Sequence, residues 1–231
     1  MQRLVPGSLR HLQPHAEVAE RVLVPGDPGR ALRIAQWLLE RPRMLNHHRG
    51  LWGYTGTAAD GAALTVQSAG MGGASTAIVV HELIALGARR LVRVGTCEAL
   101  ASGVGLGDLL VVREAVARDG TSRGLNAPER LRSDAALTED LLAAAGLQAR
   151  AGTVLTTDVF FAPTEARDRA AGAEATDLET AAFLAVATQR GATAGCVLAV
   201  TGLGPGEERI EADGLAAAEE AMGRIAAAAL S

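Results

Sequence analysis

Two kinds of apolar pattern alternate along the chain. Short runs rich in β-branched residues predict strands at residues 21–24, 52–57, 64–67, 91–94, 108–116, 152–155 and 196–200. Longer stretches with apolar residues at helical spacing predict helices at residues 29–39, 74–86, 133–145, 178–189 and 212–230. Aliphatic strands that alternate with helices are typical of an α/β fold with a largely parallel sheet.

Length and charge narrow the class of protein. The 231 residues contain neither internal repeats nor linkers, which favours a single domain over residues 1–231. A net charge of −4 argues against a protein that binds nucleic acid through phosphate contacts. The N-terminus lacks the apolar core of a signal peptide, and no run approaches the ~20 apolar residues of a membrane span. We therefore expect a soluble, cytoplasmic protein with no membrane partner.

The types of polar residue limit the chemistry further. The chain has no lysine, so an anion held by side-chain cations must be held by arginine, whose guanidinium suits bidentate contact. The two cysteines, Cys97 and Cys196, are fewer than a disulfide framework would normally use. No set of histidine and cysteine has the spacing of a metal site, so we expect no bound metal.

The loops that follow strands are where an α/β fold binds ligands. Gly26 leaves backbone N–H groups at the start of a helix, where anions are favoured, and Arg30 lies one turn into that helix. Arg93 lies within a predicted buried strand and Thr96 follows it. Together these groups would suit a phosphate. A buried arginine also needs a partner of opposite charge, so a structural ion pair is an equal alternative for Arg93 alone.

Six motifs in order carry a resemblance to a known family. They are Pro25-Gly26-Asp27-Pro28-Gly29-Arg30-Ala31, Asn46-His47-His48-Arg49-Gly50 with Gly53-Tyr54-Thr55-Gly56, Gly70-Met71-Gly72-Gly73-Ala74-Ser75, Arg93-Val94-Gly95-Thr96-Cys97, Asp158-Val159-Phe160-Phe161 and Asp177-Leu178-Glu179-Thr180-Ala181-Ala182. The chain resembles the bacterial purine nucleoside phosphorylases and uridine phosphorylases over nearly its whole length.

The resemblance implies a fold, an activity and an assembly. The fold would be a three-layer α/β fold in which helices flank a central mixed, largely parallel sheet. The activity would be phosphate-dependent cleavage of a nucleoside to the free base and (deoxy)ribose 1-phosphate, with no cofactor. The assembly would be a homo-oligomer, expected to be a hexamer of three dimers, with sites completed across each dimer.

The resemblance also implies roles for individual residues. Four kinds of role are expected. Phosphate would be bound by Gly26, Arg30, Arg49 of the neighbouring subunit, Arg93 and Thr96; ribose by His11 of the partner subunit, Met71, Leu178 and Glu179; and the base by Cys97, Phe160, Asp177, Thr201 and Gly202. The catalytic set would be Arg30, Arg93, Glu179 and Glu98.

Two of these roles have alternatives. His15 competes with His11 for contact with the ribose 5′-hydroxyl, and either could be an ordinary exposed histidine. Glu179 lies near the start of a helix, where a carboxylate often complements the helix dipole without binding a ligand.

The sequence departs from the family at two positions near the base. Gly202 stands where the bacterial purine enzymes have the aspartate that protonates the departing purine, and losing a general acid can cost roughly 10²–10⁴-fold in rate. Glu98 stands where the family has glycine. Our hypothesis is that Glu98 faces the base and helps to protonate it.

These residues do not determine whether the base is a purine or uracil. Uridine phosphorylases also lack the aspartate, but they bind uracil through a glutamine and an arginine, and residues 162–167 here offer only Arg167. Purine nucleosides are therefore slightly favoured, and uridine is the alternative. A nucleosidase that uses water and a non-catalytic nucleoside-binding protein are further alternatives.

Overall fold

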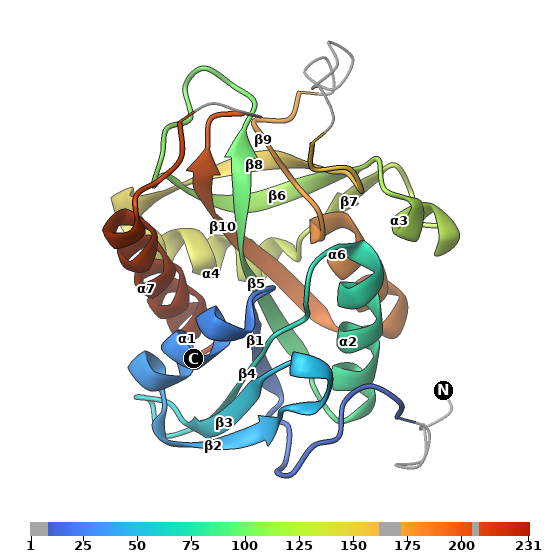
Figure 1. Cartoon of the computed structure of the whole chain (residues 1–231), viewed down its shortest axis with the longest axis vertical. Helices are drawn as coiled ribbons and strands as arrows, with labels where there is room; N and C mark the ends of the chain where they lie inside the picture. Colours follow the sequence, from blue (N-terminus) through green and yellow to red (C-terminus); the bar gives the residue numbers. More distant parts are fainter. Residues whose placement is uncertain (1–8, 162–171, 205–207) are drawn as a thin grey trace.

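The computed structural model describes residues 9–161, 172–204 and 208–231 (Figure 1). The strands are β1 (Arg21–Val24), β2 (Glu40–Asn46), β3 (Gly53–Thr57), β4 (Ala63–Gln67), β5 (Arg90–Ala99), β6 (Leu109–Ala117), β7 (Arg130–Arg132), β8 (Ala149–Thr156), β9 (Ala175–Asp177) and β10 (Thr193–Gly202). The α-helices are α1 (Pro28–Leu38), α2 (Gly73–Ala85), α3 (Gly120–Gly124), α4 (Ala135–Ala145), α6 (Thr180–Arg190) and α7 (Ala212–Ala229). The described residues also form two 3₁₀ turns, η2 (His48–Gly50) and η3 (Gly146–Gln148).

The strands join in one mixed sheet, part of which closes into a ring. β10 pairs with β6 antiparallel, β6 with β8 and β8 with β9 parallel, β9 with β5 antiparallel, and β5 with β10 parallel. From β5 the sheet continues through β1, β4 and β3 to β2. β5 and β10 therefore belong to the middle of the molecule, and their C-terminal ends meet those of β8 and β9.

Helices cover both faces of this sheet, as the sequence predicts. Successive residues of a strand point to opposite faces. On β1 and β5, Val22 and Leu91 pack in the apolar cluster that contains residues of α2 and α6, whereas Leu23 and Val92 pack in the cluster that contains residues of α1, α4 and α7. Figure 1 shows α2, α3 and α6 on one side of the sheet and α1 and α7 on the other. The expected three-layer α/β fold is confirmed.

The helix α1 begins directly after β1 because its first residues stop the strand and cap the helix. The Asp27 carboxylate accepts the backbone N–H of Arg30 at 2.6 Å, and Pro28 occupies the first helical position. Ala31 and Ile34 are fully buried on the inner face of the helix. The cap thus fixes the position of Arg30 relative to the end of β1.

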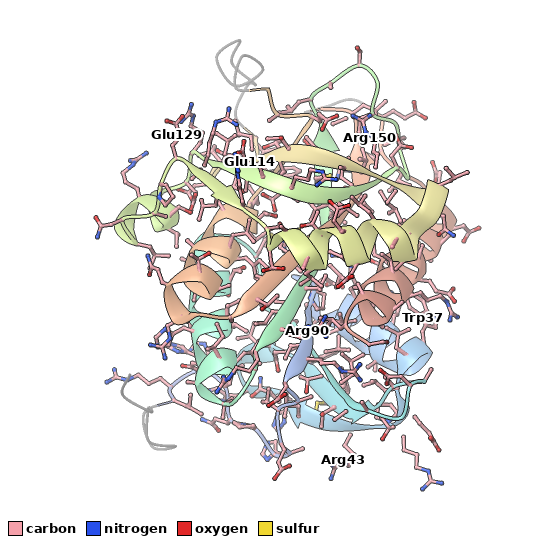
Figure 2. All side chains as sticks on the ribbon, turned by 180° about the vertical axis from the view of Figure 1, so that it is seen from behind. Trp37, Arg43, Arg90, Glu114, Glu129 and Arg150 are labelled. Carbon is pink, nitrogen blue, oxygen red and sulfur yellow. The ribbon has the colours of Figure 1, made fainter. Side chains whose placement is uncertain are left out.

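The other end of the sheet anchors the last helix, α7. The guanidinium of Arg90, labelled in Figure 2, donates to the carbonyls of Leu230 at 2.8 Å and Ala229 at 3.1 Å. These bonds satisfy carbonyl groups that the end of a helix leaves without intrahelical partners.

Within the described ranges, no helix is long and apolar enough to cross a membrane.

One prediction about the strands is wrong in a way that affects the site. The strand expected at residues 91–94 continues to Ala99, because residues 94–97 pair with β10 and Glu98 and Ala99 pair with β9. Thr96, Cys97 and Glu98 therefore lie in a strand and not in a loop. The strands β2, β7 and β9 and the short helix α3 were not predicted.

Candidate active site

A cavity of about 410 Å³ lies at the C-terminal ends of β5, β8, β9 and β10. Its position agrees with the rule that α/β sheets bind ligands at the carboxyl ends of their strands. Met71, before α2, is 81% exposed, and Phe161 is 87% exposed, so both are accessible at the wall of the cavity. Nine of the predicted site residues line it: Met71, Thr96, Cys97, Glu98, Phe160, Asp177, Leu178, Glu179 and Thr201.

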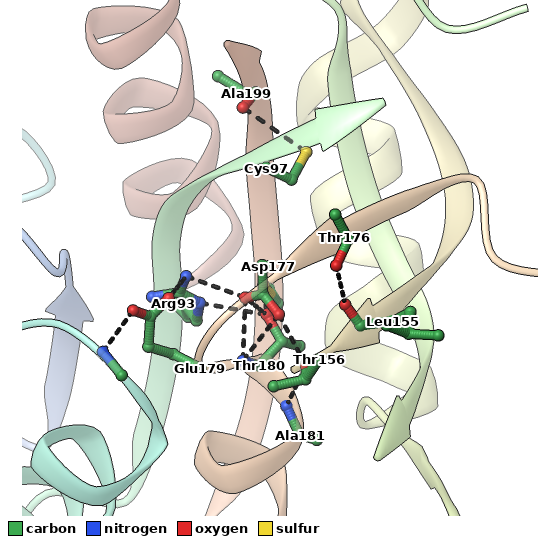
Figure 3. Close-up of polar contacts among 12 residues, drawn as sticks. Arg93, Cys97, Leu155, Thr156, Thr176, Asp177, Glu179, Thr180, Ala181 and Ala199 are labelled. Carbon is green, nitrogen blue, oxygen red and sulfur yellow. Dashed lines mark hydrogen bonds and ion pairs between the residues drawn. The ribbon is translucent and has the colours of Figure 1, made fainter. Parts of the chain in front are cut away.

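Beside this cavity, Arg93 forms a buried network with two carboxylates (Figure 3). Its Nη2 lies 3.0 Å from Asp177 Oδ2 and 2.6 Å from Glu179 Oε2, and its Nε donates to Thr180 Oγ1 at 3.2 Å. Burial alone would lower the pKa of Arg93, but the carboxylates of Glu179 and Asp177 raise it above its usual value. The ion pair that we gave as one alternative for Arg93 is present.

The guanidinium of Arg93 folds back over its own strand, where Gly95 leaves room for it. A Cβ at Gly95 would lie 2.6 Å from Arg93 Nη2 and 2.7 Å from Arg93 Cζ, which is too close for real atoms. Of the described residues, none accepts a hydrogen bond from Nη1 of Arg93. This nitrogen therefore keeps N–H donors that none of those residues uses.

Glu179 connects Arg93 to the loop before α2. Its Oε1 accepts the backbone N–H of Gly72 at 2.7 Å, while its Oε2 accepts from Arg93. Asp177 is fixed in turn by the hydroxyls of Thr156 at 2.7 Å and Thr180 at 2.6 Å. The carboxylates at this wall are therefore held in one orientation before any ligand arrives.

The thiols near this network are not nucleophiles. Cys97 donates to the carbonyl of Ala199 at 3.6 Å, and burial, with the nearby carboxylate of Asp177, raises its pKa well above the usual value. Burial also raises the pKa of Cys196 to about 12. A thiolate is the reactive form of cysteine, and neither thiol forms one near neutral pH.

The glycine loops after β1 and β4 lie against each other. The N–H of Gly70 donates to the carbonyl of Gly26 at 3.0 Å, and a Cβ at Gly26 would lie 3.1 Å from the carbonyl oxygen of Gly70. Glycine at position 26 allows this approach. The loop that carries Gly26 is thereby joined to the loop that carries Met71.

Arg30 is buried and ion-paired to α7. Its Nε donates to Glu219 Oε1 at 2.9 Å, and Arg33 donates from Nε to the other carboxylate oxygen at 2.7 Å. Glu219 is 1% exposed, so two guanidinium groups share one buried carboxylate. Asp27 Oδ1 lies 3.8 Å from Arg33 Nη2, so two carboxylates balance the two guanidinium groups, and neither Gly26 nor Arg30 lines the cavity.

His11 and Arg49, expected to serve a neighbouring subunit, do not line the cavity of their own chain. His11 Nδ1 lies 2.9 Å from Glu82 Oε1, near the C-terminal end of α2, whereas Met71 precedes the N-terminal end of that helix. Glu82 lies nine residues after Gly73 in the helix, a rise of about 14 Å. Arg49 is exposed in η2 with a positive φ of 59°.

His15, the alternative to His11, stacks on another histidine. Its ring centroid lies 5.2 Å from that of His47, and the two rings are nearly parallel, at 10°. It does not line the cavity either.

At the other end of the cavity, Glu98 forms an ion pair that was not predicted. Its Oε1 accepts from Nη1 of Arg209 at 2.9 Å, and Glu98 is 5% exposed. The guanidinium of Arg209 also lies 5.9 Å from the ring centroid of Phe160, within the range of a cation–π contact. Sequence reasoning missed Arg209, although a buried carboxylate at position 98 requires a partner.

Gly202 lies beside this ion pair at the end of β10. A Cβ there would lie 3.0 Å from Glu98 Oε1, so glycine makes room for the carboxylate.

Arg167 and the rest of residues 162–167, considered above for uracil binding, lie outside the described residues. In the ranges that are described, no group of three or more His, Cys, Asp and Glu side chains is placed to hold a metal ion.

Comparison with known proteins gives one consistent match. The sequence matches the phosphorylase superfamily over residues 20–231. It is 38% identical over 198 residues to the DeoD-type purine nucleoside phosphorylase of Bacillus thuringiensis (strain Al Hakam), which covers 80% of this chain and 82% of the relative. The DeoD-type enzyme of Bacillus cereus (strain AH187) matches with the same identity and coverage.

A solved structure agrees with these relatives. The fold is similar to the crystal structure of a purine nucleoside phosphorylase from Toxoplasma gondii in complex with immucillin-H, with a TM-score of 0.85 and 27% sequence identity. The match covers 92% of this chain and 90% of that one.

Proposed function

Because the chain belongs to the phosphorylase superfamily, and within it to the nucleoside phosphorylases, we propose that it cleaves purine nucleosides with phosphate to the free base and (deoxy)ribose 1-phosphate. The chain is an enzyme, a pentosyltransferase. The observation that carries the proposal is the cavity, because it combines a fixed carboxylate, Glu179, with an end at which Phe160 and Arg209 meet. The names of the relatives support a purine as the base.

The phosphate would bind at the end of the cavity near Thr96. Thr96, which lines the cavity, would supply a hydroxyl donor, Arg30 and Arg93 guanidinium donors and Gly26 backbone N–H groups. Arg49 would come from the neighbouring subunit. Cleavage builds positive charge on the sugar, and an anion held beneath the anomeric carbon stabilises that charge and then captures the carbon. Glu219 contributes by fixing Arg30 through a buried ion pair.

The ribose would lie over Glu179. Its 2′- and 3′-hydroxyls would donate to the Glu179 carboxylate, Met71 and Leu178 would pack against the ring, and His11 of a partner subunit would contact the 5′-hydroxyl. Because Arg93 and Gly72 already fix both oxygens of Glu179, little side-chain freedom is lost when the sugar binds.

The base would occupy the end of the cavity near Phe160. Phe160 would stack on it, Cys97 and Thr201 would form the wall with Gly202 next to them, and Asp177 would hold the neighbouring network in place. Glu98 would contact the base through the oxygen that Arg209 leaves free. Sites shared between subunits require an oligomer, and we propose a hexamer of three dimers.

The proposal is tested by base release from adenosine, inosine, guanosine, uridine and thymidine, each with and without phosphate. We expect release from purine nucleosides only when phosphate is present. Release without phosphate would indicate a nucleosidase, release from uridine alone a uridine phosphorylase, and tight binding without release a nucleoside-binding protein. Each of these three results would contradict the proposal.

A further inference from the structure

Glu98, which we expected to help protonate the base, forms an ion pair with Arg209, and Arg209 has no role in the proposed reaction. Both line the cavity, and Arg209 Nη1 lies 2.9 Å from Glu98 Oε1. Within the described part of the chain, Arg209 is the hydrogen-bond partner of this carboxylate, and Oε2 has none. An ionised carboxylate can only accept hydrogen bonds, so Oε2 offers one acceptor to a ligand in the cavity.

The position of Arg209 is set by the backbone around it. Arg209 forms a β-bridge with Gly202, and the N–H of Ile210 donates to the carbonyl of Thr201 at 3.1 Å. These contacts fold the segment back onto the end of β10. The guanidinium therefore reaches Glu98 and Phe160 from a segment that is itself fixed.

Gly202 is the residue that makes room for this pair. A Cβ at position 202 would lie 3.0 Å from Glu98 Oε1 and 3.5 Å from Arg209 Nη1. A side chain at position 202 would therefore require the Glu98 carboxylate to shift. The geometry of the ion pair is thus adapted to glycine at position 202.

An acceptor beside a set of donors matches one kind of purine edge. Adenine presents N7, an acceptor, next to its 6-amino group, a donor, whereas guanine presents two acceptors, N7 and O6. Hypoxanthine, the base of inosine, carries the same two acceptors. We propose that Glu98 Oε2 accepts from the 6-amino group while Arg209 donates to N7, so that the enzyme selects 6-aminopurine nucleosides.

The two residues would then have different functions at the base. A 6-oxo group would face the Glu98 carboxylate, and two acceptors without a proton between them repel each other. Arg209 faces N7 in either case, where its charge stabilises the electrons that the departing base gains. Selectivity thus depends on Glu98, and the rate with every purine depends on Arg209.

The inference rests on the proposed function and is tested by the ratio of kcat/KM for adenosine to that for inosine, at saturating phosphate. We expect the unmodified enzyme to favour adenosine by about 10-fold or more. Glu98→Gln should bring the ratio close to one, because an amide can turn either its oxygen or its nitrogen toward the base. Arg209→Ala should lower kcat/KM for both nucleosides by similar factors and keep the preference for adenosine.

Two further variants distinguish recognition from a general loss of structure. Glu208→Gln removes the same charge from an exposed neighbour and should keep the ratio of the unmodified enzyme. Gly202→Ala keeps both charged residues but requires the Glu98 carboxylate to shift, and should also lower the ratio. A ratio near one in the unmodified enzyme, or a ratio that Glu98→Gln leaves unchanged, would overturn the inference. If no nucleoside releases base with phosphate, the proposed function fails as well.

Discussion

At the scale of single residues, the site is built from buried charges that hold one another. Arg93 is 2% exposed and shares its guanidinium between Asp177 and Glu179, and Arg30 shares the buried Glu219 with a second arginine. Removing one partner of such a group leaves an uncompensated charge in a medium of low polarity. The same contacts that orient the site are therefore required for a stable fold.

Replacing Arg93 tests this dependence. Arg93→Gln removes the cation between two buried carboxylates, and the free energy of unfolding should fall by about 3–5 kcal/mol. Urea denaturation at neutral pH measures the change. Arg113→Gln is a suitable control, because Arg113 and its partner Glu139 are both more than half exposed and such pairs contribute at most about 1 kcal/mol. Equal losses in the two variants would show that the Arg93 network does not stabilise the fold.

Single residues also show where sequence reasoning reached its limit. An arginine between two valines predicts a buried cation that needs a partner, and the structure supplies one for Arg93. Arg209 gave no such signal, because it lies among polar residues and its partner Glu98 is 111 residues away. A local pattern indicates that a charge is buried but not which distant charge meets it.

At the scale of secondary structure elements, α2 connects the cavity with the N-terminal segment. Glu82, near the C-terminal end of α2, accepts from the backbone N–H groups of Arg10, His11 and Leu12 and from the His11 ring. Burial alone would raise the pKa of Glu82, but these hydrogen bonds outweigh it and lower the pKa. The segment that carries His11 is thus fixed by a charged group.

The pH dependence of stability tests this anchor. A carboxylate whose pKa is lowered on folding stabilises the fold at pH values above its ordinary pKa of 4.5, and this contribution is lost as the pH falls through the lowered pKa. Glu82→Gln should therefore be less stable than the unmodified protein at pH 7 by about 1.5–3 kcal/mol, and the difference should shrink on acidification below pH 4.5.

Urea denaturation at a series of pH values measures that difference. Glu17→Gln changes an exposed carboxylate on the same segment, so it should behave as the unmodified protein does. A difference between Glu82→Gln and the unmodified protein that grows as the pH falls would contradict the anchor.

The sequence predicts those helices and strands whose apolar spacing and capping residues lie within the element itself. The strand–helix order, the helix after Asp27 and the long C-terminal helix follow from spacing and caps, and the structure has them. The strand β9 has three residues, and it exists because it pairs with β5 and β8. Such a strand has no periodicity of its own, so only the tertiary structure reveals it, and with it the wall that carries Asp177.

At the scale of the whole molecule, we propose that each site is shared between two subunits. Glu179 lines the cavity of its own chain, whereas Arg49 is exposed and does not. Mixing two inactive variants tests the arrangement. After subunit exchange between Glu179→Ala and Arg49→Ala, half of the dimers are mixed and one site in each of those is intact, so about a quarter of the sites should recover activity.

Light scattering and the activity of the mixture are the measurements. The single variants should be oligomeric and nearly inactive before exchange. A mixture that stays inactive, although light scattering and mass spectrometry confirm mixed oligomers, would show that one subunit supplies both residues.

Attack of phosphate on the sugar and attack of water give different sugar products, ribose 1-phosphate and free ribose. Phosphorus NMR of adenosine incubated with the enzyme and inorganic phosphate would identify the sugar product while the base is measured in parallel. We predict a new resonance of ribose 1-phosphate that grows in step with free adenine. Release of adenine with free ribose, and no new phosphorus resonance, would contradict the account.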